Sequence, residues 1–130
     1  MAFAHEIPVR WGELDPYNHL NHAVYFSYCE AARIAMLEEA GWGMGILEDA
    51  GFRIVVTEVK AKFLRSATEG QLLRIITELH EGRRASATWR QVVRHEEDAL
   101  FEMLVTAAFT TIEGRPTRAP EGFMDAMVAT

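Results

Sequence analysis

The sequence has only one cysteine, Cys29, among its 130 residues. A lone cysteine excludes an internal disulfide and any zinc site that uses several cysteines. No uncharged apolar run approaches the roughly 18 residues that a membrane span requires. The N-terminal stretch "MAFAHEIPVRW" lacks the basic and apolar regions of a secretory signal. From these absences we expect a cytoplasmic protein with no membrane span.

Basic residues are also scarce, since 13 Lys and Arg face 19 Asp and Glu for a net charge of -6. A broad nucleic-acid surface requires a basic face, so we expect no nucleic-acid partner. A few local cations could still hold a small anionic ligand. The hydrophobic content of 49% and charged content of 25% are ordinary for a globular protein. The length predicts a single domain over residues 1–130.

Hydrophobic periodicity predicts one long helix among several strands. Alternation from Phe3 to Trp11 indicates a first strand. An apolar, alanine-containing stretch from His22 to about Ala40 predicts a largely enclosed helix, with Asn21 as N-cap and Gly41 as C-cap glycine. Four further strands are expected at 52–65, 72–80, 85–95 and 100–112.

Short polar turns between the later strands imply antiparallel pairing. In the strand at 52–65, the expected single face carries Val55, Thr57, Val59, Ala61 and Phe63. The stretch "EGRPTRAPEGF" suggests the chain leaving its last strand. The predicted fold class is α+β, with a curved antiparallel sheet of about five strands wrapped around one long helix.

The segment "WGELDPYNHLNHAVYFSYCEAAR" concentrates titratable and hydrogen-bonding groups immediately before the predicted helix. Asp15, His19, Asn21 and His22 fall within eight positions. A helix N-terminus offers unpaired backbone amides and the positive end of the helix dipole. A carboxylate held beside such amides suits attack on a carbonyl whose oxygen gains negative charge. Asp15 could equally be a turn-forming acid.

This segment and the order of one helix followed by four strands resemble the hotdog-fold acyl-CoA thioesterases, especially the 4-hydroxybenzoyl-CoA thioesterase group. The matching positions are Asp15, His22, Ala23, Tyr25, Glu30, Ala32 and Arg33, and the Asp-x-x-x-His-x-Asn loop variant appears as Asp15, His19 and Asn21. One departure is "RSATEGQL", with Ser66-Ala67 and Gly70-Gln71 where the family usually has Pro-Ala and Gly-Asp. The resemblance implies a hotdog fold and hydrolysis of an acyl-CoA to a free acid and coenzyme A.

The resemblance also implies residue roles. Asp15 would act as nucleophile or general base, and the backbone amide at His22 would polarise the thioester carbonyl. The His22 side chain could assist at the carbonyl or the leaving thiolate, while His19 and Asn21 would fix the loop. Tyr25 would pack at the mouth of the acyl pocket, with its hydroxyl on a backbone group. Glu30 is expected to pair with Arg33 at i,i+3 spacing, and it is a reserve catalytic carboxylate because another hotdog subgroup uses a mid-helix glutamate.

Cofactor and partner expectations follow from the same resemblance. No cofactor and no metal are expected, although His19 and His22 lie close to Asp15. Hotdog sites form between subunits, so a homodimer or homotetramer is expected. The coenzyme A phosphates require cations, and Arg65, Arg83 and Arg84 are weak candidates.

Two other functions fit parts of the sequence. A hotdog enoyl-CoA hydratase would also use an Asp and a His, but "DPYNHLNHA" mixes the elements of its loop without matching them. A non-catalytic module that binds acyl-CoA or an acyl carrier would have no need for Asp15.

Overall fold

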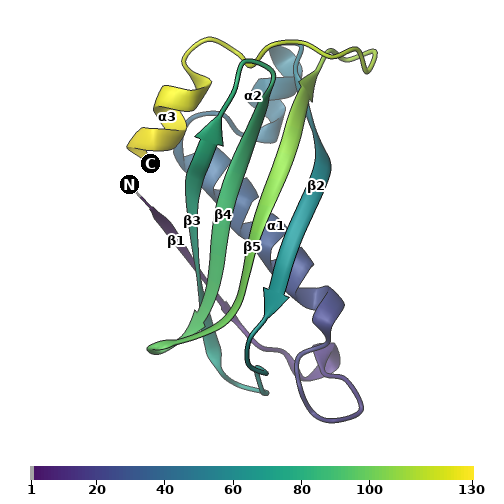
Figure 1. The fold of residues 1–130 in the computed structure, drawn as a ribbon, viewed down its shortest axis with the longest axis vertical. Helices are drawn as coiled ribbons and strands as arrows, with labels where there is room; N and C mark the ends of the chain where they lie inside the picture. Colours follow the sequence, from purple (N-terminus) through teal and green to yellow (C-terminus); the bar gives the residue numbers. More distant parts are fainter. Residues whose placement is uncertain (1) are drawn as a thin grey trace.

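The computed structural model describes residues 2–130, in which a five-stranded sheet faces one long helix (Figure 1). The elements are β1 (Phe3–Pro8), a 3-10 turn (Trp11–Glu13), α1 (His22–Glu39), α2 (Met44–Asp49), β2 (Arg53–Phe63), β3 (Leu72–Gly82), β4 (Ser86–His95), β5 (Asp98–Thr110) and α3 (Phe123–Ala129). The strand order is β1-β3-β4-β5-β2, and every neighbouring pair is antiparallel. The predicted α+β architecture is confirmed.

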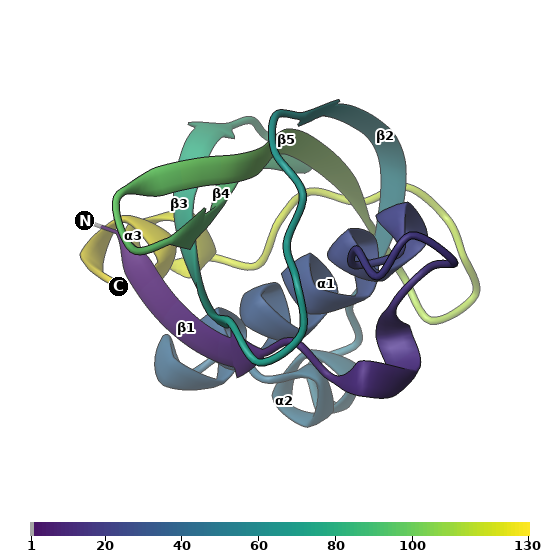
Figure 2. The ribbon, with the colours of Figure 1, turned by 90° about the horizontal axis from the view of Figure 1, so that it is seen from below.

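The sheet curves around α1, as the end-on view in Figure 2 shows. The core lies between the helix and the concave face of the sheet. Alternate residues of β5 from Phe101 to Phe109 are buried on that face, as are Leu73, Ile75 and Thr77 of β3. This alternation of buried and exposed residues is that of a strand with one face on the core and one face in solvent.

Helix α1 has the predicted bounds and caps. The Asn21 side chain accepts a hydrogen bond from the Ala23 amide at 3.0 Å, and Gly41 adopts φ +83 after the last turn. The buried stripe consists of Tyr25, Tyr28, Cys29, Ala32, Met36 and Leu37. The prediction of a largely enclosed helix is wrong for the single chain, since Ser27, Glu30, Ile34 and Glu38 on the other side are exposed. The sheet covers only one side of the helix.

The predicted face of β2 is wrong at its N-terminal half because of a β-bulge at Thr57. The register with β5 skips from Val56 opposite Ala107 to Glu58 opposite Thr106. An extra residue reverses the alternation of side chains. Ile54 and Val56 therefore share the concave face with Val59, Ala61 and Phe63, while Val55 lies on the outer face.

Several element boundaries also differ from the prediction. The first strand ends at Pro8, whose ring nitrogen has no hydrogen to donate, and Trp11 lies in a 3-10 turn with 77% of its surface exposed. Strand β5 begins and ends two residues earlier than predicted. Helix α3 was not predicted, because the prolines and glycines just before it are typical of a loop. The i,i+4 spacing of the buried Phe123 and Met127 was its only signal.

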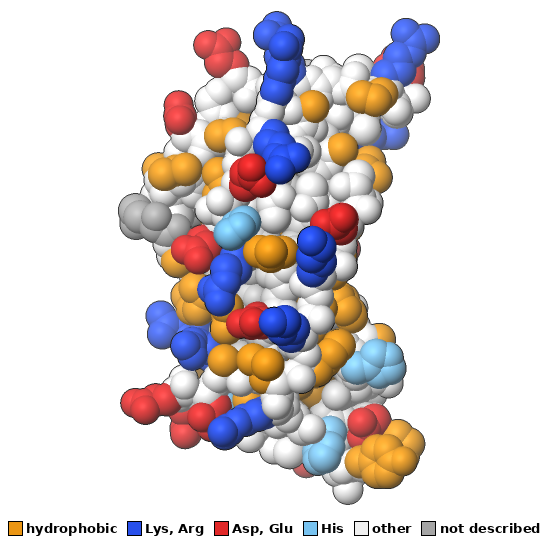
Figure 3. Space-filling view, in the orientation of Figure 1, with side chains coloured by type: hydrophobic (Ala, Val, Ile, Leu, Met, Phe, Trp, Pro, Cys, Tyr) orange, Lys and Arg blue, Asp and Glu red, His pale blue; other side chains and the backbone are white. Residues whose placement is uncertain are grey.

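The outer face of the sheet is charged and solvated (Figure 3). Arg90 lies 3.9 Å from Glu78 and 3.6 Å from Glu102, with all three side chains partly exposed. Such exposed pairs contribute little to stability. None of the helices within residues 2–130 has both the length and the hydrophobicity of a membrane span.

Beneath α1, a buried polar network links the helix to the sheet. The Gln91 side-chain amide donates to the Cys29 carbonyl and the Thr77 hydroxyl, each at 2.9 Å. Its oxygen accepts from Arg33 Nη1 at 2.7 Å. Gln91 and Thr77 are fully buried.

We predict that Gln91→Met lowers the free energy of unfolding by at least ~2 kcal/mol, because it leaves the Arg33 guanidinium and the Thr77 hydroxyl unpaired. Thr88→Val is the matched control, since the Thr88 hydroxyl pairs with that of Thr106 on the partly exposed outer face. It should cost less than ~1 kcal/mol. Urea unfolding measures the free energy of unfolding of each variant. An equal loss in the two variants would contradict the prediction.

Candidate active site

A cavity of about 280 Å³ lies at the start of α1. Three segments enclose it: the loop before the helix, the first turn of the helix, and the end of β2 with the chain that follows. Its lining residues are Asp15, His19, Leu20, His22, Tyr25, Phe63, Leu64, Arg65 and Ser66. The structure thus brings together the predicted Asp15, His19, His22 and Tyr25, which all come from the N-terminal motif, with the more distant Arg65.

The loop that carries Asp15 is closed by its own hydrogen bonds. Asp15 Oδ1 accepts from the backbone amides of Tyr17 at 2.8 Å and His19 at 3.1 Å. The Asp15 amide donates to the His19 carbonyl at 2.7 Å. Asn18 adopts φ 63, a left-handed conformation that asparagine tolerates better than most residues. The aspartate therefore does form a turn, and this turn fixes the carboxylate at the wall of the cavity.

The first turn of α1 places His22 and Tyr25 at the same cavity. Asn21 satisfies two amides, since its side chain accepts from Ala23 and its carbonyl accepts from Val24 at 2.9 Å. The His22 amide has no acceptor within residues 2–130. It stands at the positive end of the helix dipole. The exposed His22 ring makes an edge contact with Phe63, with ring centroids 6.2 Å apart.

Tyr25 joins the helix to the chain after β2. Its buried hydroxyl accepts from the Ala67 amide at 3.2 Å and donates to the Arg65 carbonyl at 3.5 Å. Its ring stacks on Phe101 with centroids 4.9 Å apart. Burial raises the pKa of this phenol above its ordinary value. The predicted backbone contact of the Tyr25 hydroxyl is confirmed.

Glu13 and Tyr28 form a contact that the sequence does not predict. The Tyr28 hydroxyl donates to Glu13 Oε1, and the Glu13 carbonyl accepts from the Asn21 amide at 2.9 Å. The contact attaches the base of the Asp15 loop to the middle of α1. Tyr28 follows Tyr25 at i+3 on the buried stripe. A buried tyrosine requires a polar partner, and this is the only sequence signal for the contact.

The predicted Glu30–Arg33 ion pair is wrong. No Glu30–Arg33 contact within 4.0 Å occurs in the part of the chain that the structure describes, and Arg33 bonds to Gln91 instead. Glu30 points outward because the sheet covers the opposite side of the helix. It also lies outside the Asp15 cavity of its own chain.

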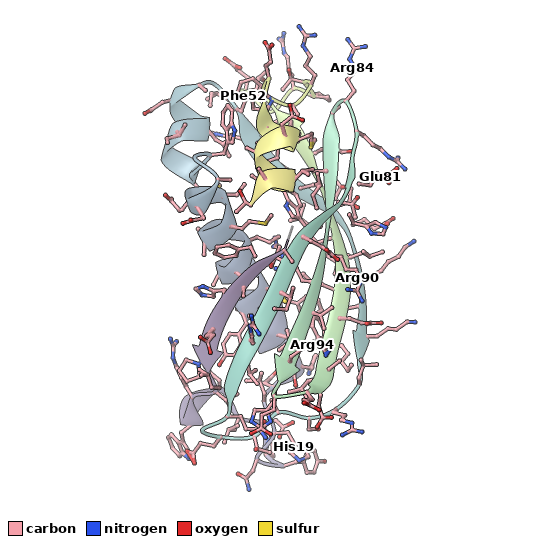
Figure 4. The ribbon with its side chains drawn as sticks, turned by 90° about the vertical axis from the view of Figure 1, so that its left-hand side faces the viewer. His19, Phe52, Glu81, Arg84, Arg90 and Arg94 are labelled. Carbon is pink, nitrogen blue, oxygen red and sulfur yellow. The ribbon has the colours of Figure 1, made fainter. Side chains whose placement is uncertain are left out.

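The three candidate cations for coenzyme A separate in space. Arg65 lines the Asp15 cavity and lies 3.3 Å from Asp98. Arg83 and Arg84 lie in the β3–β4 hairpin, and Figure 4 shows Arg84 and His19 at opposite ends of the molecule. The length of the strands separates this hairpin from the Asp15 cavity. Arg83 and Arg84 therefore do not line the cavity of their own chain. Among residues 2–130, no three His, Cys, Asp or Glu side chains gather as metal ligands.

The fold is that of an α+β protein with a curved antiparallel sheet around one long helix, and known families that share it identify the superfamily. The model of the thioesterase-like superfamily matches residues 9–127, so the chain belongs to that superfamily. A chloroplastic acyl-acyl carrier protein thioesterase of Arabidopsis thaliana, ATL2, is 26% identical over 117 residues, which are 88% of this chain and 62% of that protein. The chain therefore spans less than two thirds of that relative.

Solved structures share the fold over nearly the whole chain. A probable thioesterase from Bartonella henselae has a TM-score of 0.88 and 25% identity, covering 92% of this chain and 100% of its own. YbaW, a probable thioesterase from Escherichia coli, has a TM-score of 0.85 and 26% identity, covering 97% of this chain and 98% of its own. The predicted hotdog fold and family are confirmed.

The contact between Glu13 and Tyr28 leads to a pH prediction. Burial, followed by the hydrogen bond to Glu13, raises the pKa of Tyr28 from 10.0 to about 12. The folded state therefore keeps this proton better than the unfolded state does. The resulting stability is complete below pH 10 and is lost as the pH rises toward 12.

Tyr28→Phe should make the free energy of unfolding less dependent on pH between 10 and 12, although it lowers stability at neutral pH. Chemical unfolding across that range measures the slope. The exposed Tyr17→Phe is the control and should keep the wild-type slope. Equal slopes in wild type and Tyr28→Phe would contradict the prediction.

Proposed function

We propose that this protein is an acyl-CoA thioesterase, which converts an acyl-CoA and water to a carboxylic acid and free coenzyme A. One observation carries the proposal: Asp15 and His22 line the same cavity, and the His22 amide has no acceptor within residues 2–130. We further propose that residues 1–130 act as one hotdog domain, without a metal or other cofactor. Location in the cytoplasm stays a prediction.

In the proposed reaction, the His22 amide stabilises the carbonyl oxygen and Asp15 supplies the nucleophile or the base. The His22 amide donates to the thioester oxygen as it becomes negative, a contribution of roughly 2.7–4 kcal/mol for a donor of this kind. Asp15 either attacks the carbonyl carbon or removes a proton from the water that does. The carbon–sulfur bond then breaks, and the thiolate leaves and takes up a proton. In the first route, water afterwards hydrolyses the acyl-Asp15 anhydride.

The remaining residues support this reaction in the proposal. His19 shapes the turn through its amide, and Asn21 caps the amides that would compete with that of His22. The His22 side chain can protonate the leaving thiolate. Arg65 lines the cavity and is the candidate cation that the same chain offers to a coenzyme A phosphate.

A homodimer is part of the proposal, and the edge strand β2 supports it. This strand has 11 residues and no neighbour on one side. Its side chains Val56, Val59 and Phe63 are 50%, 41% and 51% exposed on the concave face, and Phe63 also lines the Asp15 cavity. A long apolar edge strand readily pairs with another strand. Most homo-oligomers are two-fold symmetric, and a two-fold axis makes β2 pair antiparallel with its copy.

We predict that Asp15→Asn lowers kcat by at least ~100-fold while the protein stays folded, because the nucleophile or base is lost. Asp49→Asn, at the exposed end of α2, is the matched control and should keep wild-type activity. The measurement is thiol release from aromatic, short-chain and long-chain acyl-CoA, with circular dichroism as the folding check. Turnover by Asp15→Asn at the wild-type rate would contradict the mechanism.

The same screen distinguishes other functions. Loss of unsaturation from an enoyl-CoA without thiol release would indicate a hydratase, and binding without any release would indicate a non-catalytic module. Hydrolysis of an acyl-carrier-protein thioester but not of acyl-CoA would indicate that the substrate is an acyl carrier protein thioester and not an acyl-CoA.

A second prediction concerns β2. Val59→Asp should convert the dimer to monomers, because it buries a charge at the middle of the proposed interface. Leu72→Asp is the control, since Leu72 has a similar exposure of 51% but lies on β3. Light scattering after size exclusion measures the mass. A monomeric wild type with full activity would contradict the proposed dimer.

A further inference from the structure

One residue that lines the Asp15 cavity, Ser66, has no part in the mechanism proposed above. Ser66 is exposed, and it follows β2 by three residues. Its hydroxyl makes no hydrogen bond within residues 2–130, and its backbone amide has no acceptor there. Proline, the usual residue at this position in the family that the sequence resembles, has neither of these two donors. The donors of Ser66 are therefore a feature of this chain.

Hydrogen bonds fix the backbone on both sides of Ser66. The Tyr25 hydroxyl donates to the carbonyl of Arg65, the residue before Ser66, at 3.5 Å. It accepts from the amide of Ala67, the residue after Ser66, at 3.2 Å. The Ala67 carbonyl in turn accepts from the Leu20 amide at 2.8 Å. A donor on a fixed backbone needs little reorganisation when negative charge develops beside it.

The pairing of two loop segments places Ser66 beside the start of α1. His19 and Thr68 form an antiparallel bridge. In antiparallel pairing, each step forward along one segment corresponds to one step back along the other. Two steps from the bridge, Asn21 therefore lies opposite Ser66. The residue after Asn21 is His22, whose amide is the proposed donor to the thioester oxygen.

This position favours a donor to the carbonyl oxygen over a nucleophile. A serine nucleophile requires a base within hydrogen-bond reach. Among the residues that the structure describes, no hydrogen bond joins Ser66 to His22 or to Asp15. A donor requires only an acceptor from the substrate, and the thioester oxygen is expected at the helix start that Ser66 faces.

We propose that the Ser66 hydroxyl donates a hydrogen bond to the same thioester oxygen as the His22 amide. This inference rests on the proposed thioesterase function and deepens it by naming a second donor to the reacting carbonyl. Two donors from different segments then share the negative charge of the tetrahedral intermediate. The task of Asp15 as nucleophile or base is the same with one donor or two.

The first test is Ser66→Ala, which removes the hydroxyl and keeps the backbone. We expect kcat to fall by at least ~10-fold, less than the roughly 10²–10³-fold typical of an oxyanion donor, because Ser66 is exposed. KM should stay within ~2-fold, because the contact strengthens only as the oxygen becomes negative. Ser66→Thr keeps a hydroxyl and should restore kcat to within ~3-fold of wild type.

Thr68→Val is the matched control for the loss of a hydroxyl. Thr68 is exposed like Ser66 and lies two residues further along the chain, but it does not line the Asp15 cavity. This variant should keep the wild-type kcat. Thiol release measures all four proteins, and circular dichroism checks that each is folded.

A second test measures the polarisation of the carbonyl directly. The probe is an acyl-CoA analogue with a methylene group in place of the thioester sulfur and an isotope label at the carbonyl carbon. A hydrogen bond to a carbonyl oxygen lowers the C=O stretching frequency. Infrared difference spectra should therefore show a higher frequency in Ser66→Ala than in wild type or Thr68→Val. Because the analogue is not hydrolysed, the result does not depend on turnover.

The outcomes separate the inference from the function on which it rests. If wild type releases no thiol from any acyl thioester, the proposed function fails. If wild type is active and Ser66→Ala keeps its kcat, the second donor is wrong and the thioesterase assignment stands. A lower kcat with an unchanged carbonyl frequency would also overturn the inference. An acyl group found on Ser66 by mass spectrometry would overturn it as well, because the residue would then be a nucleophile.

Discussion

The hydrogen bond from the Ala67 amide to the Tyr25 hydroxyl is the contact on which the candidate site depends. It joins the first turn of α1 to the chain that follows β2, two segments more than forty residues apart in sequence. The same stretch pairs with the Asp15 loop, because the Leu20 amide donates to the Ala67 carbonyl at 2.8 Å. Three separate segments thus meet at one residue, and the cavity lies among them.

In the proposed mechanism, this arrangement gives Asp15 both a structural and a chemical role. One carboxylate oxygen closes the turn through two backbone amides, which fixes the orientation of the other oxygen. Asn21 satisfies the neighbouring amides of the helix start and leaves that of His22 available. A carboxylate and a donor fixed before the substrate arrives need little reorganisation during the reaction, which is the main requirement for electrostatic catalysis.

Local patterns predicted local structure well. The Asn21 cap, the bounds of α1 and the position of Tyr25 all follow from residues close together in sequence, and the motif located the cavity. Features set by distant contacts were not predictable. The bulge at Thr57 depends on the register with β5, and the Glu13–Tyr28 contact depends on how the loop folds back onto the helix. Arg33 bonds to Gln91 because the sheet brings β4 beneath α1, which spacing along the helix cannot reveal.

The exposed side of α1 and the free edge of β2 are the two features that support the proposed homodimer. The proposed mechanism requires that the Asp15 carboxylate and the His22 amide act on the same carbonyl group. The most direct measurement is a crystal structure with an acyl-CoA analogue in which a methylene group replaces the thioester sulfur. We expect its carbonyl oxygen to lie within hydrogen-bond distance of the His22 amide, with Asp15 beside the carbonyl carbon. A carbonyl bound elsewhere, with Asp15 facing only solvent, would contradict it.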